Sequence, residues 1–170
     1  MNREKTAFFT GHRALPQDNM AELRAQLYSA VGRLIHMGYD SFICGGAIGF
    51  DTEAALCVLA YREKFPNVRL ILALPCRDQT QKWENLKSLN TYKHILGAAD
   101  LVEYMQPFHT SDCMHISNRW MADHSSVCLA YLTSQQGGTA YTFRYAQKKG
   151  LKAVNLAEGL VSEQLKIPNI

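Results

Sequence analysis

Short apolar runs alternate with longer stretches of helical periodicity along most of the chain. The apolar runs at residues 6–10, 41–44, 68–74, 101–104, 127–132 and 152–156 predict six strands. Helices are expected between them, over residues 16–37, 51–64, 79–96, 111–125 and 139–149. In the first of these helices the apolar residues recur at three- and four-residue spacing, as an amphipathic helix requires: Met20, Leu23, Leu27, Val31, Leu34 and Ile35.

Strands separated by crossovers of helical length predict an α/β fold. We expect a Rossmann-like open parallel sheet of about six strands with helices on both faces. The third run, VRLILAL at residues 68–74, is continuously apolar, which is typical of a strand buried on both sides. No linker, repeat or low-complexity segment interrupts the pattern. The sequence therefore predicts one domain over residues 1–170.

Composition and charge narrow the classes of partner. The net charge of the 170 residues is only +3, and no run of five Lys or Arg occurs, so a single-stranded nucleic acid partner has little support. Five widely spaced cysteines without a CxxC pair predict neither a disulfide framework nor a zinc ribbon. We expect no signal peptide from the first residues, which contain no long apolar stretch, and no apolar run reaches the ~20 residues of a membrane span. We expect a cytoplasmic protein without a membrane partner, and homo-oligomer formation stays open.

The turn after the first expected strand carries polar side chains on a tight backbone. In an open parallel sheet, ligands bind beyond the carboxyl ends of the strands, so the residues that follow each strand are the candidates. Here they are Thr10, Gly11, His12 and Arg13. The glycine permits a sharp path and the other three side chains suit an anion. The alternative is an ordinary polar loop with a surface arginine.

The turn after the second expected strand, GGAIGFD, leads directly into a helix. Its glycines allow close approach of a ligand to the backbone, and the helix N-terminus offers free N–H donors. Asp51 has two interpretations: a helix cap or first-turn carboxylate, or an acceptor for a ribose hydroxyl or base edge. Position alone favours the cap. The candidate binding residues of this turn are Gly45, Gly46, Ala47, Gly49 and Asp51.

A second glycine-rich turn follows the fifth expected strand and again opens a helix. Gly137, Gly138 and Thr139 would present free amides and a hydroxyl to a phosphate. The alternative is a flexible loop whose helix is capped by Thr139. Two such loops at the carboxyl ends of separate strands predict a cleft for a small phosphorylated ligand.

The expected helix at residues 111–125 carries further candidates, Asn118 and Arg119. Arg119 shares one helical face with His115 and Asp123, and this face is either a solvated charged stripe or a surface that presents Arg119 and Asn118 to the cleft. No metal is expected, because four residues that superficially resemble ligands match no common zinc spacing: His109, Asp112, Cys113 and His115.

Trp83 falls within the expected helix over residues 79–96. Its ring would either pack in the core or stack on the base of a ligand. The core is favoured, because large aromatic side chains dominate packing.

Four segments, TGHR, GGAIGFD, NRWMADHS and GGTAYT, resemble the YpsA-like family of the SLOG superfamily. Other branches of this superfamily include the DNA-processing protein DprA and the LOG nucleotide phosphoribohydrolases, and the match spans residues 6–156. The resemblance implies a Rossmann-like fold and a site for a nucleotide or nucleotide-derived ligand. It implies that the loop from Gly45 to Asp51 contacts the ligand and that Gly137, Gly138 and Thr139 bind phosphate. It also implies a regulatory role in cell division or stress, as in Firmicutes.

One departure from the LOG enzymes bears on catalysis. Their PGGxGTxxE pattern supplies a glutamate for cleavage of the N-glycosidic bond, whereas this chain reads QQGGTAYT and places Thr142 there. A nucleotide-binding sensor is therefore the leading hypothesis, with no cofactor beyond that ligand. The alternatives are a nucleoside-monophosphate N-glycosidase, with Asp51 or Asp123 as the carboxylate and Arg119 on the phosphate, and single-stranded DNA binding by analogy with DprA.

Overall fold

The computed structural model describes residues 1–158 and confirms the α/β class. One parallel sheet contains six strands in the order β4-β3-β2-β1-β5-β6. Their bounds are β1 Thr6–Gly11, β2 Ser41–Cys44, β3 Arg69–Cys76, β4 Leu101–Gln106, β5 Val127–Tyr131 and β6 Lys152–Asn155. The single domain expected over residues 1–170 includes residues 159–170, which lie outside the described residues, and it stays a prediction.

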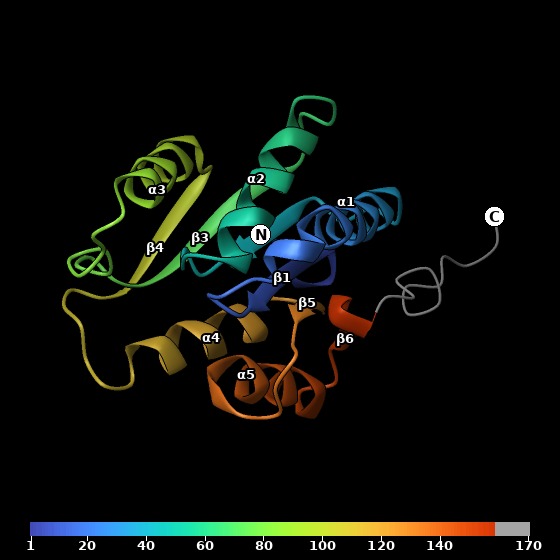
Figure 1. Ribbon diagram of the computed structural model, residues 1–170. Coiled ribbons are helices and arrows are strands. Elements are labelled where there is room, and N and C mark those ends of the chain that lie inside the picture. The colour runs from blue at the N-terminus through green and yellow to red at the C-terminus, as the bar shows by residue number, and fades with distance from the viewer. Residues whose placement is uncertain (159–170) are drawn as a thin grey trace.

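Helices cover both faces of the sheet (Figure 1). The described residues contain five α-helices: α1 Met20–His36, α2 Phe50–Arg62, α3 Leu86–Ala98, α4 Cys113–Asp123 and α5 Gly137–Lys148. Helices α1, α2 and α3 pack on one face, and α4 and α5 pack on the other. None of the helices in the described part of the chain is both long and apolar enough to span a membrane.

Alternation along the central strand β1 explains how the two layers are filled. Ala7 and Phe9 point into the core under α1 and α2, whereas Phe8 points into the core under α4 and α5. All three side chains are fully buried. The ring of Phe9 lies 6.1 Å from that of Phe42 and 6.4 Å from that of Phe50. Burial of each such ring contributes about 2 to 3 kcal/mol to folding, so β1 anchors both layers.

The strand order places a topological switch point between β1 and β5. After β1 the chain builds β2, β3 and β4 outward on one side, and it then returns to pair β5 with the other side of β1. The connections that leave β1 and β5 therefore run to opposite faces of the sheet. Such divergence leaves a crevice beyond the carboxyl ends of the two strands.

The helix expected over residues 79–96 begins later in the structure than the sequence predicts. Residues 77–82 form turns, in which Gln81 N–H donates to Asp78 O (3.0 Å), and residues 83–85 are irregular; Trp83 N–H donates to Thr80 O (2.9 Å). Helix α3 begins only after Asn85, whose side chain accepts from the backbone N–H of Ser88 (3.0 Å). An asparagine cap satisfies the first amides of the helix and sets its start. The turns occupy space beyond the end of β3, which extends to Cys76.

The five cysteines are all free and buried. Burial, together with a hydrogen bond to Asp78, raises the pKa of Cys76 to about 12. This thiol therefore stays protonated near neutral pH, as a small apolar core residue does.

Candidate functional site

A cavity of about 520 Å³ lies at the switch point, and we call it the switch-point cavity. The end of β1, the β2–α2 loop, one face of α4 and the first turn of α5 form its walls. Most of the predicted site residues line it: Thr10, Gly11, His12, Arg13, Ala47, Asp51, Asn118, Gly137, Gly138 and Thr139. Sequence reasoning did not assign four other lining residues to this site: Phe9, Met114, His115 and Met121. The last three share the helical face of Asn118, and their three- and four-residue spacing is the signal that identifies them.

Helix α5 presents an uncapped N-terminus to this cavity. The residue before the helix, Gln136, makes no side-chain cap hydrogen bond, and Gly137, Gly138 and Thr139 form the first turn. The interpretation of Thr139 as the cap is therefore wrong. The first amides of a helix lack intrahelical acceptors, and the helix dipole adds partial positive charge. This end of the cavity is suited to an anion.

Three polar side chains face the cavity with hydrogen-bonding capacity to spare. Within residues 1–158, neither Arg13 nor Asn118 makes a side-chain hydrogen bond or ion pair. Nδ1 of His115 is buried and likewise has no partner in that part of the chain. Buried polar atoms are normally paired, so the unpaired Nδ1 of His115 is notable, and the exposed Arg13 and half-buried Asn118 side chains can both reach a ligand.

His12 has a structural task in addition to the ligand contact that the sequence predicts. Its Nε2 accepts a hydrogen bond from the backbone N–H of Thr133 (3.0 Å), which leaves Nδ1 as the donor nitrogen of the ring. The ring also meets the edge of Tyr131 at 6.3 Å. His12 thereby fastens the loop after β1 to the loop after β5, although it also lines the cavity.

Asp51 is the carboxylate of the cavity wall, and it is only 7% exposed. It is not the N-cap, which is Gly49; it is a first-turn residue whose Oδ2 accepts from the backbone N–H of Ala47 (3.3 Å). Burial raises the pKa of Asp51 to about 7, against the opposing effects of the Ala47 and Gly45 amides and of Arg13. The carboxyl therefore keeps its proton to a higher pH than an ordinary aspartate does, which weakens its repulsion of an anionic ligand.

The glycines of GGAIGFD position the loops and do not line the cavity. A Cβ on Gly45 would lie 2.9 Å from Asp51 Oδ2, and one on Gly46 would lie 2.5 Å from Leu74 Cδ2. Gly49 packs directly on the backbone of His12 and Arg13. Close approach of backbones and of the Asp51 side chain therefore explains these three glycines.

Arg119 lies outside the switch-point cavity. Its Nε donates to the hydroxyl of Tyr141 on α5 (2.9 Å). Asp123, on the same face, accepts from the Tyr145 hydroxyl (3.1 Å) and pairs with Lys149 (3.0 Å). The charged face of α4 is therefore an exposed, salt-bridged surface beside α5, as the solvated-stripe interpretation expects, and the expected contact of Arg119 with the cleft is not found in the lining of this cavity. The backbone turns 100° per residue in a helix, so Asn118 faces the cavity while Arg119 does not.

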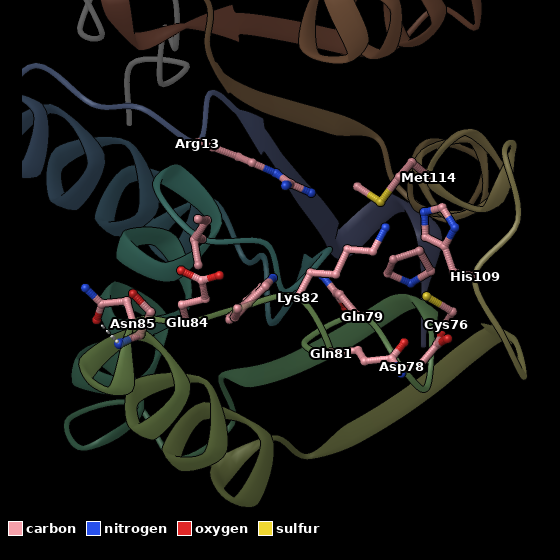
Figure 2. Close-up of a pocket in the computed structure, with 14 residues that line it drawn as sticks. Arg13, Cys76, Asp78, Gln79, Gln81, Lys82, Glu84, Asn85, His109 and Met114 are labelled. Atoms are coloured by element: carbon pink, nitrogen blue, oxygen red, sulfur yellow. Dashed lines mark hydrogen bonds between the residues drawn. The ribbon is translucent and has the colours of Figure 1, made fainter.

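A second cavity of about 490 Å³, the Trp83 cavity, adjoins the first and shares Arg13 and Met114 with it. Figure 2 shows its lining, which comes mainly from the turns after β3. Sequence reasoning missed it because the turns were expected to be helical; the signal was Asn85, a favoured cap residue. The core prediction for Trp83 is wrong as well. Its half-buried ring lines this cavity and meets Tyr92 edge-on, with ring centroids 5.3 Å apart.

Two further features bear on chemistry. Thr142, at the place of the LOG glutamate, is fully buried, and its hydroxyl donates to Gly138 O (2.8 Å) within α5. Among residues 1–158, no group of three or more His, Cys, Asp or Glu side chains is arranged to hold a metal ion.

Two comparisons with solved structures describe the fold. DNA processing protein A from Streptococcus pneumoniae is similar with a TM-score of 0.61 and 13% identity, over 94% of this chain and 53% of that one. The protein of the same name from Helicobacter pylori has a TM-score of 0.61 and 17% identity, over 97% and 75%. At such identities the likeness shows the Rossmann-like architecture alone. This chain spans about half the length of the Streptococcus pneumoniae protein.

Sequence relatives are more specific. The SPbeta prophage-derived protein YoqJ of Bacillus subtilis is 30% identical over 142 residues, which cover 76% of this chain and 82% of YoqJ. A UPF0398 protein of Bacillus pumilus is 26% identical over 128 residues, 74% of this chain and 68% of that protein. The profile of the YspA SLOG family (YpsA) matches residues 10–161, a span that contains every loop of the switch-point cavity. The chain therefore belongs to the YspA SLOG family.

Proposed function

We propose that this protein binds a nucleotide, or a phosphorylated molecule derived from one, in the switch-point cavity and acts as a sensor of that ligand. The observation that carries the proposal is the uncapped first turn of α5, which shares the cavity with two unpaired side chains, Arg13 and Asn118. A phosphate accepts hydrogen bonds from backbone amides and guanidinium groups alike. Membership of a SLOG family supports the same assignment.

The cavity is also consistent in size and lining with the phosphate and sugar of a nucleotide. A volume of about 520 Å³ lies within the usual range of small-molecule sites. In addition to the first amides of α5 and the guanidinium of Arg13, the cavity wall carries the carboxyl of Asp51, which can accept a hydrogen bond from a sugar hydroxyl. A phosphate at α5 and a ribose near Asp51 would use both ends of this wall.

Gly138→Asp tests the phosphate end. A Cβ at Gly138 meets no atom within 4 Å, and a carboxylate in the first turn favours the helix, so this variant is expected to fold normally. Its charge would lie beside the bound phosphate, and repulsion of a few kcal/mol predicts about 100-fold weaker binding. Isothermal titration calorimetry with AMP, ADP, NAD and ADP-ribose measures the change. Gly138→Ala, the uncharged control, should bind within about threefold of the parent; equal affinities of all three proteins would contradict the proposal.

Two further measurements distinguish the alternatives, N-glycosidic hydrolysis and single-stranded DNA binding: an assay for released base, and a titration with an oligonucleotide. N-glycosidic hydrolysis would release free base in proportion to protein, and it would depend on Asp51, the one carboxylate among the residues that line the switch-point cavity. Single-stranded DNA is suggested by the fold likeness to the Helicobacter pylori protein, whose solved structure concerns single-stranded DNA binding. Binding of an oligonucleotide with a steep negative salt dependence, and of no free nucleotide, would favour that alternative.

A further inference from the structure

The Trp83 cavity continues the switch-point cavity along the carboxyl edge of the sheet. Arg13 and Met114 line both cavities, so one ligand can occupy them together. In Figure 2 the side chains of Arg13 and Lys82 extend toward the same central space from different elements. Cations at this junction suit an anionic ligand that extends from one cavity into the other.

Two acceptor oxygens of this cavity have no donor. The side chain of Gln79 is oriented by its Nε2, which donates to Gly45 O (3.3 Å). Its Oε1 is buried, and no donor among residues 1–158 reaches it. Asp78 Oδ1, also in the lining, is buried and unpaired within the same residues, although the Asp78 carboxyl also interacts with the Cys76 thiol. Unpaired buried acceptors are costly, so a ligand that fits here would supply N–H groups.

An aromatic wall stands beside these acceptors. Trp83 is half-buried, and Tyr92 holds its ring edge-on at an angle of 74°. A ring restrained by one neighbour and otherwise facing a cavity offers a surface for stacking. The ring of Trp83 can stack on the face of a nucleobase, and the unpaired oxygens of Gln79 and Asp78 can accept hydrogen bonds from the N–H groups on its edge.

We propose that the Trp83 cavity binds the base of the nucleotide, stacked on Trp83, with the N–H groups of the base donated to Gln79 Oε1 and Asp78 Oδ1. This assignment rests on the proposed function, because the phosphate end of the same ligand lies at α5. It makes Trp83, Gln79 and Asp78 determinants of specificity and Arg13 the contact between the two ends.

The fluorescence of Trp83 provides a direct test. The chain has two tryptophans, and Trp120 stacks on His124 with ring centroids 4.1 Å apart and lines neither cavity. In a Trp120→Phe background, the tightest binder among ADP, GDP, CDP and UDP should quench the emission of Trp83. Ribose 5-phosphate, which lacks a base, should bind without quenching.

Affinity of two Trp83 variants completes the test. Loss of stacking in Trp83→Ala should weaken the nucleotide about tenfold and leave ribose 5-phosphate unchanged, whereas Trp83→Phe should restore most of the nucleotide affinity. Nucleotide binding that is lost in Gly138→Asp but is insensitive to Trp83, without quenching, would overturn the base subsite and leave the proposed function standing. Quenching that survives Gly138→Asp would support the base subsite and remove the phosphate from α5. Absence of binding by every probe would overturn both.

Discussion

Gly49→Ala is expected to destabilise the fold by roughly 4 kcal/mol. Gly49 precedes α2 with φ 89° and ψ −124°, a conformation that side chains rarely adopt. An added Cβ would lie 2.6 Å from Arg13 Cα and 2.6 Å from His12 O. The same carbonyl accepts the N–H of Phe50 (3.1 Å), so the two loops cannot separate without loss of this hydrogen bond. Backbone strain and steric overlap therefore act together where the loops after β1 and β2 meet, and both loops line the cavity.

Urea unfolding monitored by circular dichroism measures this loss. Gly97→Ala is the matched control, because Gly97 lies in α3 with no atom within 4 Å of an added Cβ. The control should be more stable than the parent by about 0.5 to 1 kcal/mol, since alanine is the better helix former. If Gly49→Ala were as stable as the parent, the close packing of the loops after β1 and β2 would be wrong.

Asp51→Asn is expected to remove a pH dependence of stability on the order of 4 kcal/mol. Burial raises the pKa of Asp51 to about 7, whereas an aspartate in an unfolded chain has a pKa of about 3.9. Below pH 4 the carboxyl is protonated in both states. Between pH 4 and 7 the folded protein keeps a proton that the unfolded chain has released, so the free energy of unfolding of the parent falls as pH rises. Above pH 7 the carboxyl is deprotonated in both states, and the free energy of unfolding no longer falls because of Asp51.

Unfolding of parent and variant at pH 5, 6, 7 and 8 tests this expectation. All other titratable groups are common to both proteins, so the difference between the two curves isolates Asp51. Asp51→Asn should gain stability over the parent as pH rises, because asparagine carries no charge and its oxygen still accepts from the Ala47 amide. A constant difference across the range would mean that the carboxyl is not desolvated in the folded protein.

Much of the architecture can be predicted from the sequence, because its signals are local. The apolar run at residues 68–74 predicts a buried strand, and β3 is buried at all but its first residue. Each of the first five strands is followed by a helix of crossover length, which favours a parallel sheet with helices on both faces. Residues that directly follow strands gather at one edge of such a sheet, and so Arg13, Asp51 and Gly138 could be assigned to one site before any contact was known.

Other features depend on contacts between distant segments, and only the tertiary structure decided them. Whether a glycine contacts a ligand or a neighbouring loop depends on what packs against it: Gly49 meets Arg13, 36 positions earlier in the chain. Arg119 donates to the Tyr141 hydroxyl on α5 and does not line the cavity. Trp83 lines a cavity because the turns after β3 are fixed to Gly45 by Gln79. Periodicity and turn propensity describe the chain within one element, whereas burial, pKa and the lining of a cavity are set by atoms that only folding brings together.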